Sequence, residues 1–349
     1  MPSGTGGDAS AGRRTVLAAP DKFRGTATAR EISSAVARAA AACGWACDQA
    51  PLADGGEGTL AALGGAVRHT TVRGPLGNPV RAEWRISEQT AVVEMAQASG
   101  LDLVGGPEGN DPLRASTVGT GELIATAIDA GAKRVIVGAG GSATTDGGFG
   151  AVGALNPERR LRNVELLVAC DVDIVFIDAA RLFAAQKGAT PAQVELLRRR
   201  LERLAQVYLR DYGTNVRELP GSGAAGGLAG GLAAVGATLV GGFDLVAEAI
   251  ELAERAAGAD LVVTGEGTLD AESFRGKAVG GVIKVAREAG VPVLVIVGDV
   301  DPEEDEGALP ALGAGVEVVS LAERYGVGRA LADTTACVTE VVTEALVSR

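Results

Sequence analysis

One glycine-rich stretch holds most of the side chains that could do chemistry in this chain. Residues 135–154 read VIVGAGGSATTDGGFGAVGA, and two glycine pairs there enclose Ser142, Thr144, Thr145 and Asp146. The β-branched run 135–137 predicts a buried strand, followed by a turn and a helix. Unpaired backbone N–H groups at a helix start attract anions. The stretch is therefore either a phosphate-binding turn, with Asp146 facing a cation or a hydroxyl, or a turn that only lets strand and helix pack closely.

Acidic residues end several other predicted strands. Asp21, Lys22 and Arg24 follow the apolar run 15–20, and the stretch 54–58 reads DGGEG, a pattern that recurs as DGGFG at 146–150. The run 164–173 ends in Asp171 and Asp173, and the run 259–270 carries Glu266 and Asp270. Open α/β sheets bind ligands at the carboxyl ends of their strands. The two DGGxG turns could face one pocket, or their recurrence could be chance.

Basic residues narrow the chemistry further. The only histidine, His69, lies in a polar stretch far from the glycine turns, which argues against Ser-His-Asp and Cys-His enzymes and leaves proton transfer to Asp, Glu or Lys. Of the five lysines, Lys22, Lys187 and Lys277 lie in segments that read as turns. We expect at least one of them to bind phosphate, although exposed loops also collect lysines.

The elements that must position these residues are those of an α/β protein. The 349 residues are 47% hydrophobic but only 3% aromatic, with 51 glycines, which predicts a closely packed aliphatic core. Turn, helix and strand alternate as in a doubly wound sheet, whereas residues 69–95 alternate with period two, as antiparallel strands do. The sequence therefore predicts two layers or subdomains of different kinds.

Composition and motifs exclude several classes of protein. A net charge of −12 argues against nucleic acid as a partner, and the four cysteines form no CxxC pair for zinc. There is no apolar leader or long apolar run, so we expect a protein of the cytoplasm, without a membrane partner, whose residues 1–12 are disordered. GSGAAGG at 221–227 matches a dinucleotide motif, but no clear strand precedes it, and no Walker A motif occurs.

Eight blocks together resemble the glycerate kinase family, in the order of that family. They span most of the chain and read APDKFRGTATA at 19–29, LADGGEGT at 52–59, GNDPLRASTVGTGEL at 109–123, GAGGSATTDGG at 138–148, ACDVD at 169–173, QKGAT at 186–190, GSGAAGGL at 221–228 and VVTGEGTLDAESFRGKA at 262–278.

The resemblance implies a kinase without a Walker A motif that transfers the γ-phosphoryl group of ATP to D-glycerate with Mg²⁺, giving 2- or 3-phosphoglycerate. It implies a doubly wound, Rossmann- or flavodoxin-like parallel sheet and a second, smaller mixed-sheet domain, with the active site in the cleft between them. We place the first domain at 13–65 plus 255–349 and the second at 66–254. A homodimer is one assembly that this organisation allows.

Site residues follow from the resemblance together with the chemistry of their side chains. Either Asp171 or Asp54 would accept the hydroxyl proton, Lys22 and Lys277 would neutralise phosphates, and Arg24 would clamp the carboxylate. Nucleotide binding would use Gly140, Gly141, Ser142, Thr144, Thr145, Asp146 and Lys277. Substrate binding would add Gly55, Gly56, Glu57 and Lys187. Glu266 and Asp270 are candidates for Mg²⁺ or for a purely structural turn.

The chain departs from the family pattern at two places. A strand, loop and helix are missing near 155–163, and a polar loop after ACDVD is replaced by apolar Ile174 to Ile177. These four residues either extend a strand into the core or line the acceptor pocket. In the second case the acceptor would be a larger or less polar hydroxy acid. A further alternative is a relative that binds a metabolite without turning it over.

Overall fold

The computed structural model describes residues 13–274, 277–300, 312 and 314–349, so the tail predicted to be disordered, 1–12, lies outside the described residues. The chain divides into two compact units. Unit 1 combines Met1–Leu52 with Ala247–Arg349, and unit 2 is Ala53–Val246. The sequence analysis predicted the boundaries between the two domains at residues 65/66 and 254/255.

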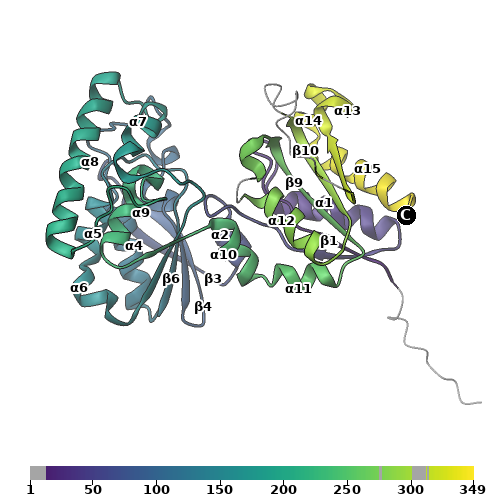
Figure 1. Ribbon diagram of the computed structural model, residues 1–349, viewed down its shortest axis with the longest axis horizontal. Helices are drawn as coiled ribbons and strands as arrows, with labels where there is room; N and C mark the ends of the chain where they lie inside the picture. The colour runs from purple at the N-terminus through teal and green to yellow at the C-terminus, as the bar shows by residue number, and fades with distance from the viewer. Residues whose placement is uncertain (1–12, 275–276, 301–311, 313) are drawn as a thin grey trace, which may run out of the picture. The chain divides into compact units, whose positions relative to one another are not determined.

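Unit 1 is built on a parallel sheet in the order β11-β10-β9-β1-β2 (Figure 1). Every pairing described in it is parallel. Counted along the chain within the unit, this order is 2-1-3-4-5, which is the flavodoxin-like arrangement and confirms the predicted doubly wound sheet. The strands are β1 Thr15–Ala18, β2 Ala46–Gln49, β9 Leu261–Leu269, β10 Val293–Val300 and β11 Val316–Ser320.

Helices cover both faces of this sheet. The helices α1 and α15 pack on one face over Val16, Leu294 and Ile296, while α12 packs on β9 and β10 and lies on the other side in Figure 1. Thr28 and Glu31 form a capping box that starts α1. The helical elements are α1 Ala29–Ala42, α10 Gly242–Ala249 (which crosses the unit boundary), α11 Leu252–Ala257, η5 Ala271–Phe274, α12 Ala278–Glu288, α13 Leu321–Tyr325, α14 Val327–Ala332 and α15 Thr334–Val347.

Unit 2 is built on a mixed sheet in the order β3-β4-β5-β6-β7-β8. The first three strands pair antiparallel, as the period-two pattern predicted, and β5 to β8 pair in parallel. The unit was expected to be the smaller domain, yet it spans the longer part of the chain. Its strands are β3 Ala66–Arg73, β4 Pro79–Ser87, β5 Thr90–Glu94, β6 Arg134–Gly138, β7 Glu165–Ala169 and β8 Thr238–Val240.

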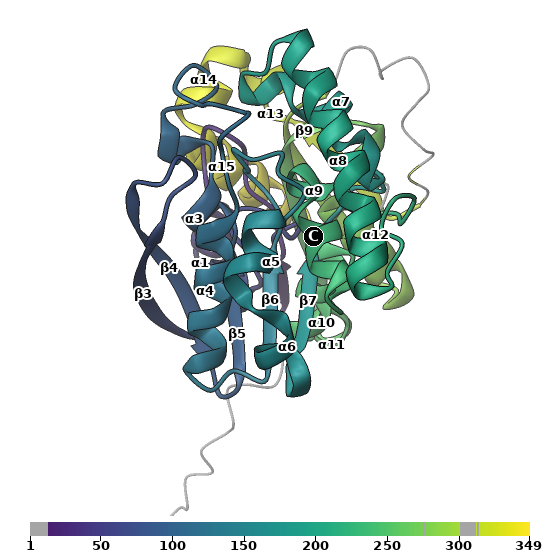
Figure 2. The same ribbon diagram turned by 90° about the vertical axis from the view of Figure 1, so that its left-hand side faces the viewer.

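In unit 2, helices α4, α5 and α9 pack with the sheet in one core, and Figure 2 shows α4 and α5 in front of β5 and β6. Helix α8 packs on a second cluster around Phe176. The helical elements are α2 Thr59–Leu63, α3 Ala96–Ser99, η1 Asp102–Val104, α4 Val118–Asp129, α5 Phe149–Leu155, α6 Pro157–Arg160, η2 Leu161–Asn163, η3 Phe176–Asp178, α7 Ala179–Phe183, η4 Ala185–Lys187, α8 Pro191–Tyr212 and α9 Ala224–Ala234.

The apolar residues after ACDVD do not extend a strand, so that interpretation was wrong. Strand β7 ends at Ala169, and Phe176, which is 0% exposed, packs edge-on against Tyr208 with 6.1 Å between ring centroids. The carbonyl of Ile174 accepts a 2.8 Å hydrogen bond from the N–H of Gly223. Phe176 is therefore a core residue, and it begins a short 3₁₀ helix.

Of the helices that the structure describes, none is long and apolar enough to cross a membrane.

Candidate active site

The DGGEG turn, 54–58, lies over the carboxyl ends of β6 and β7. A Cβ atom on Gly140 would lie 2.7 Å from the Cα of Gly56, so the two predicted turns approach this closely only because both positions are glycine. Glu94, 5% exposed at the end of β5, accepts hydrogen bonds of 3.0 and 2.9 Å from two backbone N–H groups of the turn and of α2. The DGGEG turn thus meets the start of the Gly140–Gly148 turn at one edge of the sheet.

The same edge brings Asp54 and Asp171 together. The Oδ1 atom of Asp171 accepts a 2.7 Å hydrogen bond from the N–H of Gly242, and a Cβ on Gly242 would lie 2.2 Å from the carbonyl oxygen of Asp54. Asp54 itself accepts a 3.3 Å hydrogen bond from the N–H of Gly56. Both carboxylates are half-buried. The two candidate proton acceptors therefore lie on neighbouring, mutually packed segments at the strand ends.

Only part of the turn from Gly140 to Gly148 reaches the surface. Gly141 is exposed and Gly140 is half-buried, whereas residues 142–145 are buried. The buried part is fixed by a bridge to Gly100 and by a 3.0 Å hydrogen bond from the N–H of Ala143 to the preceding residue, Ser99. An anion in solvent would therefore meet this turn at its two leading glycines, while the hydroxyl side chains face inward.

Asp146 joins this turn to the start of α4. Its carboxylate accepts hydrogen bonds from the N–H of Thr117 at 2.9 Å, from the hydroxyl of Thr117 at 2.8 Å, and from the N–H groups of Gly148 and Gly150 at 3.1 and 3.2 Å. Charge-assisted bonds of this kind are stronger than neutral ones. The sequence analysis predicted that Asp146 faces a cation or a hydroxyl group. In the structure, backbone N–H groups and the hydroxyl of Thr117 donate hydrogen bonds to its carboxylate.

The GSGAAGG stretch packs against the buried side of the same turn. No strand directly precedes it, as the sequence indicated, and Gly226 has a φ of +68°. A Cβ there would lie 2.0 Å from the carbonyl oxygen of Thr144, and Gly226 accepts a 3.0 Å hydrogen bond from the N–H of Gly147. Its glycines therefore allow two backbone segments to touch.

Lys187, predicted to bind substrate, is only 3% exposed. Its Nζ donates hydrogen bonds to the Oγ of Ser142 at 2.6 Å and to the carbonyl oxygen of Thr144 at 2.7 Å. Burial lowers the pKa of the Lys187 amine to about 7, and the charge of Asp146 partly opposes that shift. The amine thus contacts the inside of the turn.

In unit 1, Asp21 and Lys22 follow β1 at its carboxyl end. The N–H of Asp21 donates a 2.9 Å hydrogen bond to the carbonyl of Gly265 in β9, and the side chain of Asp21 accepts one of 2.7 Å from the N–H of Lys22. The Lys22 ammonium lies 3.9 Å from the same carboxylate, and Arg24 is exposed. The predicted basic residues therefore stand on a turn anchored to the neighbouring strand.

Glu266, in β9, is a half-buried carboxylic acid whose pKa is strongly shifted. Its pKa is raised to about 7, mainly by burial; the charges of Asp21 and Asp270 add to this shift, and the hydrogen bond of Ser273 and the charge of Lys277 oppose it. Its Oε1 atom is buried, and no group in the described part of the chain makes a hydrogen bond to it. Asp270 accepts 2.8 and 3.0 Å hydrogen bonds from the N–H and hydroxyl of Ser273. Asp21, Glu266 and Asp270 thus concentrate negative charge at the ends of β1 and β9.

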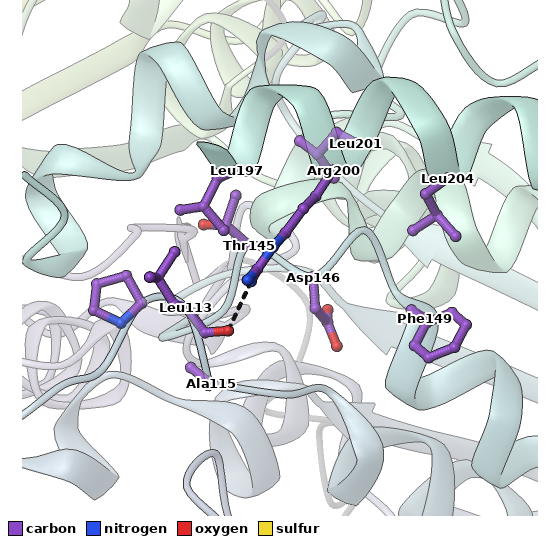
Figure 3. Close-up of a pocket in the computed structure, with 10 residues that line it drawn as sticks. Leu113, Ala115, Thr145, Asp146, Phe149, Leu197, Arg200, Leu201 and Leu204 are labelled. Atoms are coloured by element: carbon purple, nitrogen blue, oxygen red, sulfur yellow. Dashed lines mark hydrogen bonds between the residues drawn. The ribbon is translucent and has the colours of Figure 1, made fainter. Parts of the chain in front are cut away.

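A cavity of about 250 Å³ lies beside the turn in unit 2 (Figure 3). Leucines of α8 form one wall and Leu113 another, while Thr145 and Asp146 of the turn also line it. Arg200 crosses it to donate a 2.9 Å hydrogen bond to the carbonyl of Leu113. Phe149, 65% exposed, lies at one end of this lining.

Sequence reasoning missed three residues that hold these turns. Glu94 fixes the DGGEG turn, Thr117 binds Asp146, and Asn110 donates 2.9 Å hydrogen bonds to the carbonyls of Ala143 and Lys187. Glu94 carried a signal, because an acidic residue ended the apolar run TAVVE. The other two lie in the block GNDPLRASTVGTGEL, 109–123, but nothing in the block indicates the contacts that they make.

Fold and site together define a two-unit α/β protein whose charged and glycine-rich turns gather at the carboxyl ends of parallel strands in each unit. The glycerate kinase family model matches residues 16–158 and 156–346, and the chain belongs to that family. The two matched stretches overlap at residues 156–158. Here α6 and a 3₁₀ turn link α5 directly to β7.

The chain is similar to curated glycerate kinases over most of its length. It is 38% identical over 330 residues to the glycerate kinase of Bacillus subtilis, covering 83% of this chain and 86% of that one. It is 38% identical over 323 residues to the glycerate 2-kinase of Escherichia coli, covering 81% and 84%. A putative glycerate kinase 2 of Salmonella typhimurium, a solved structure, matches with a TM-score of 0.80 and 34% identity over 96% of this chain and 98% of that one.

Proposed function

We propose that this protein transfers the γ-phosphoryl group of ATP to D-glycerate. The observation that carries the proposal is that the family match runs through every turn that gathers charge at the strand ends of both units. A fold alone needs the glycines of these turns but not Lys22, Asp54 or Asp171. The E. coli relative is named a glycerate 2-kinase, which favours 2-phosphoglycerate as the product.

In unit 2, Asp171 is the better candidate for the proton acceptor. Its Oδ1 atom is held by the N–H of Gly242 at 2.7 Å, a bond that fixes the direction of the carboxylate. Asp54 lies on the adjoining segment, where Gly55, Gly56 and exposed Glu57 would contact the acceptor. Half-buried Gly140 and exposed Gly141 offer backbone without side chains to an oxyanion.

In unit 1, the basic residues would neutralise phosphate charge. Lys22 and Lys277 both stand at the strand-end edge, and Lys277 directly precedes α12, where the helix dipole also favours negative charge. Exposed Arg24 offers a planar fork that suits a carboxylate. Phosphoryl transfer depends mainly on such positioning and charge neutralisation.

Mg²⁺ fits the acidic group of unit 1. A divalent cation would contact the buried Oε1 of Glu266, to which none of the described groups donates a hydrogen bond, and would relieve the repulsion from Asp21 and Asp270. Among the described residues no cluster of three acidic, histidine or cysteine ligands exists, but Mg²⁺ commonly uses only one or two carboxylates and completes its shell with phosphates and water. Glu266 and Asp270 would hold the ion, which when bound neutralises phosphate charge.

A different hydroxy-acid acceptor loses its main support. It rested on Ile174 to Ile177 lining the pocket, but Phe176 is core and Ile174 packs on Gly223. We therefore retain glycerate as the acceptor.

The decisive experiment incubates the purified chain with Mg·ATP and D-glycerate and couples the product to enolase. 2-Phosphoglycerate gives phosphoenolpyruvate directly, whereas 3-phosphoglycerate does so only after phosphoglycerate mutase is added. L-Glycerate and other 2-hydroxy and 3-hydroxy acids serve as comparison substrates. No phosphoenolpyruvate with both coupling enzymes present would refute the proposal, and a tenfold higher kcat/KM for another acid would restore the alternative acceptor.

A further inference from the structure

Lys187 is buried, and no carboxylate among the described residues accepts a hydrogen bond from its amine. The two oxygens that accept from its Nζ, the Oγ of Ser142 and the carbonyl of Thr144, are both neutral. A buried ammonium is costly unless charge compensates it, so the site favours the neutral amine when no anion is near. Such a group is more often found where function requires it than where only packing does.

The surroundings hold Lys187 in place from its backbone as well. Asn110 donates 2.9 Å hydrogen bonds to the carbonyl oxygens of both Lys187 and Ala143, which ties the η4 segment to the turn. Gly188, at a φ of +91°, packs on Pro107, because a Cβ there would lie 2.3 Å from the Pro107 carbonyl oxygen. The amine therefore keeps its position under the turn.

The turn has an inner and an outer side. Lys187 contacts residues 142 and 144 from the inside, and the residues directly before them, Gly140 and Gly141, are the ones that reach the surface. An oxyanion bound at these two glycines would lie beside Ser142, whose Oγ accepts the 2.6 Å hydrogen bond from the ammonium. An opposite charge at such short range favours the charged form of an amine.

The charged and titratable groups around the amine are few. From the turn, the charge of Asp146 acts on Lys187. From the loop before α4, Asn110 is neutral, and from α8, Tyr208 reaches the turn as a phenol that donates a 2.9 Å hydrogen bond to the Gly147 carbonyl. Burial raises the pKa of Tyr208, so it stays neutral throughout the working range.

We infer that Lys187 is a positioning residue that supplies positive charge from beneath the Gly140–Gly141 end of the turn, so that binding of an oxyanion there is coupled to proton uptake by this amine. The inference rests on the proposed function, because it takes the oxyanion from that reaction. Phosphate of the nucleotide and carboxylate of glycerate share this chemistry.

The test is calorimetry of the full chain at pH 8.0 in two buffers of different ionisation enthalpy. Titration with Mg·ADP and, separately, with D-glycerate distinguishes the two oxyanions. For the ligand that binds at the turn, we expect uptake of roughly half a proton, since the amine is mostly neutral before binding and partly charged afterwards. Uptake close to zero with both ligands, while both bind, would overturn the inference.

Variants separate charge from structure. Lys187→Arg keeps a permanent charge, so binding is expected within about tenfold of the wild type but without proton uptake. Lys187→Met should lose the uptake and weaken binding by roughly 10- to 100-fold. Lys133→Met is the matched control, because Lys133 is an exposed lysine of the same unit and should change neither quantity.

The outcomes also separate this inference from the proposed function. If Lys187→Met does not fold, the comparison of Lys187→Arg with the wild type still decides the matter. If the two proteins take up equal numbers of protons and the wild type is an active glycerate kinase, the inference about Lys187 is refuted and the proposed function is not. Absence of activity and of binding in the wild type would refute the proposed function itself.

Discussion

Each unit holds a buried titratable group next to turns that we assign to ligand binding, and the two groups are of opposite charge type. Unit 2 buries the amine of Lys187 and unit 1 buries the carboxyl of Glu266, and burial moves the pKa of each to about 7 from opposite directions. Each group is thus half charged near neutral pH, and each lies next to residues that we assign to anion or cation binding. The comparison shows that one physical cause, burial, has opposite effects in the two units. It lowers the pKa of an amine in unit 2, which a nearby anion would raise, and it raises the pKa of a carboxyl group in unit 1, which a nearby cation would lower.

The largest expected effect concerns the proton acceptor in unit 2. Asp171→Asn should lower kcat by about 10²- to 10⁴-fold, because an amide of the same shape cannot take a proton. The measurement is steady-state kinetics with D-glycerate and Mg·ATP. The matched control is Asp173→Asn, which changes an exposed carboxylate two residues away. If both variants turned over alike, the base would have to be sought at Asp54.

A smaller effect is expected for the basic turn in unit 1. Lys22→Met should lower kcat/KM for Mg·ATP by roughly 10- to 10³-fold, because a phosphate charge would lose its partner. Exposed Lys284 in the same unit provides the control variant Lys284→Met. Unchanged kinetics in Lys22→Met would remove Lys22 from the site and leave phosphate binding to Lys277.

Asp146 should affect stability as well as activity. Asp146→Asn weakens the bonds to Thr117, Gly148 and Gly150, so we expect a loss of about 2 to 4 kcal/mol in the free energy of unfolding. Urea denaturation measures the change. Asp129→Asn, which breaks an exposed pair with Arg160, should cost less than about 1 kcal/mol. Equal losses in the two variants would contradict a structural role for Asp146.

The pH dependence of stability should differ between the units, and the two tryptophans allow each unit to be followed alone. Trp45 is buried in unit 1 and Trp84 in unit 2. In unit 2, between pH 7 and 10.5 the unfolded chain keeps a proton on Lys187 that the folded chain has released, so stability rises with pH. Below pH 7 both states are charged and this dependence ends.

The corresponding test uses Trp45→Phe as background, so that fluorescence reports on Trp84. The free energy of unfolding should rise by at most about 1.4 kcal/mol per pH unit between pH 7 and 10, and Lys187→Met should flatten that rise. A slope that survives in Lys187→Met would assign it to another group.

Unit 1 should show the opposite slope over a lower window. Between pH 4.5 and 7 folded Glu266 keeps a proton that the unfolded chain has lost, so stability falls as pH rises. In the Trp84→Phe background and with EDTA present, Glu266→Gln should reduce this fall by about 1 to 3 kcal/mol over the window. An unaltered profile would mean that Glu266 is not protonated in the folded state.

Much of this architecture could be predicted from local sequence. The β-branched run 135–137 became part of β6, and the period-two pattern became the β3–β4–β5 antiparallel strands. These features depend on periodicity and on the few residues that can make a tight turn. Local physics suffices for them.

Tertiary contacts decided what the sequence left open. The outward or inward orientation of Lys187 depends on Ser142 and Asn110, which lie 45 and 77 residues away along the chain. The apolar residues after ACDVD were misread because Phe176 packs against glycines of α9 and the turn rather than along β7. No window of sequence contains both sides of such a contact.

The discontinuity of unit 1 has a consequence for how the chain is made. Strand β1 pairs with β9, whose first residue, Leu261, leaves the ribosome long after Thr15. At translation rates of 5 to 20 residues per second, the delay is roughly 10 to 50 s. During that time β1, α1 and β2 are present without their central neighbour, while all of unit 2 has been synthesised. Newborn chains should therefore finish unit 2 first and expose the apolar edge of β1 to chaperones until β9 arrives.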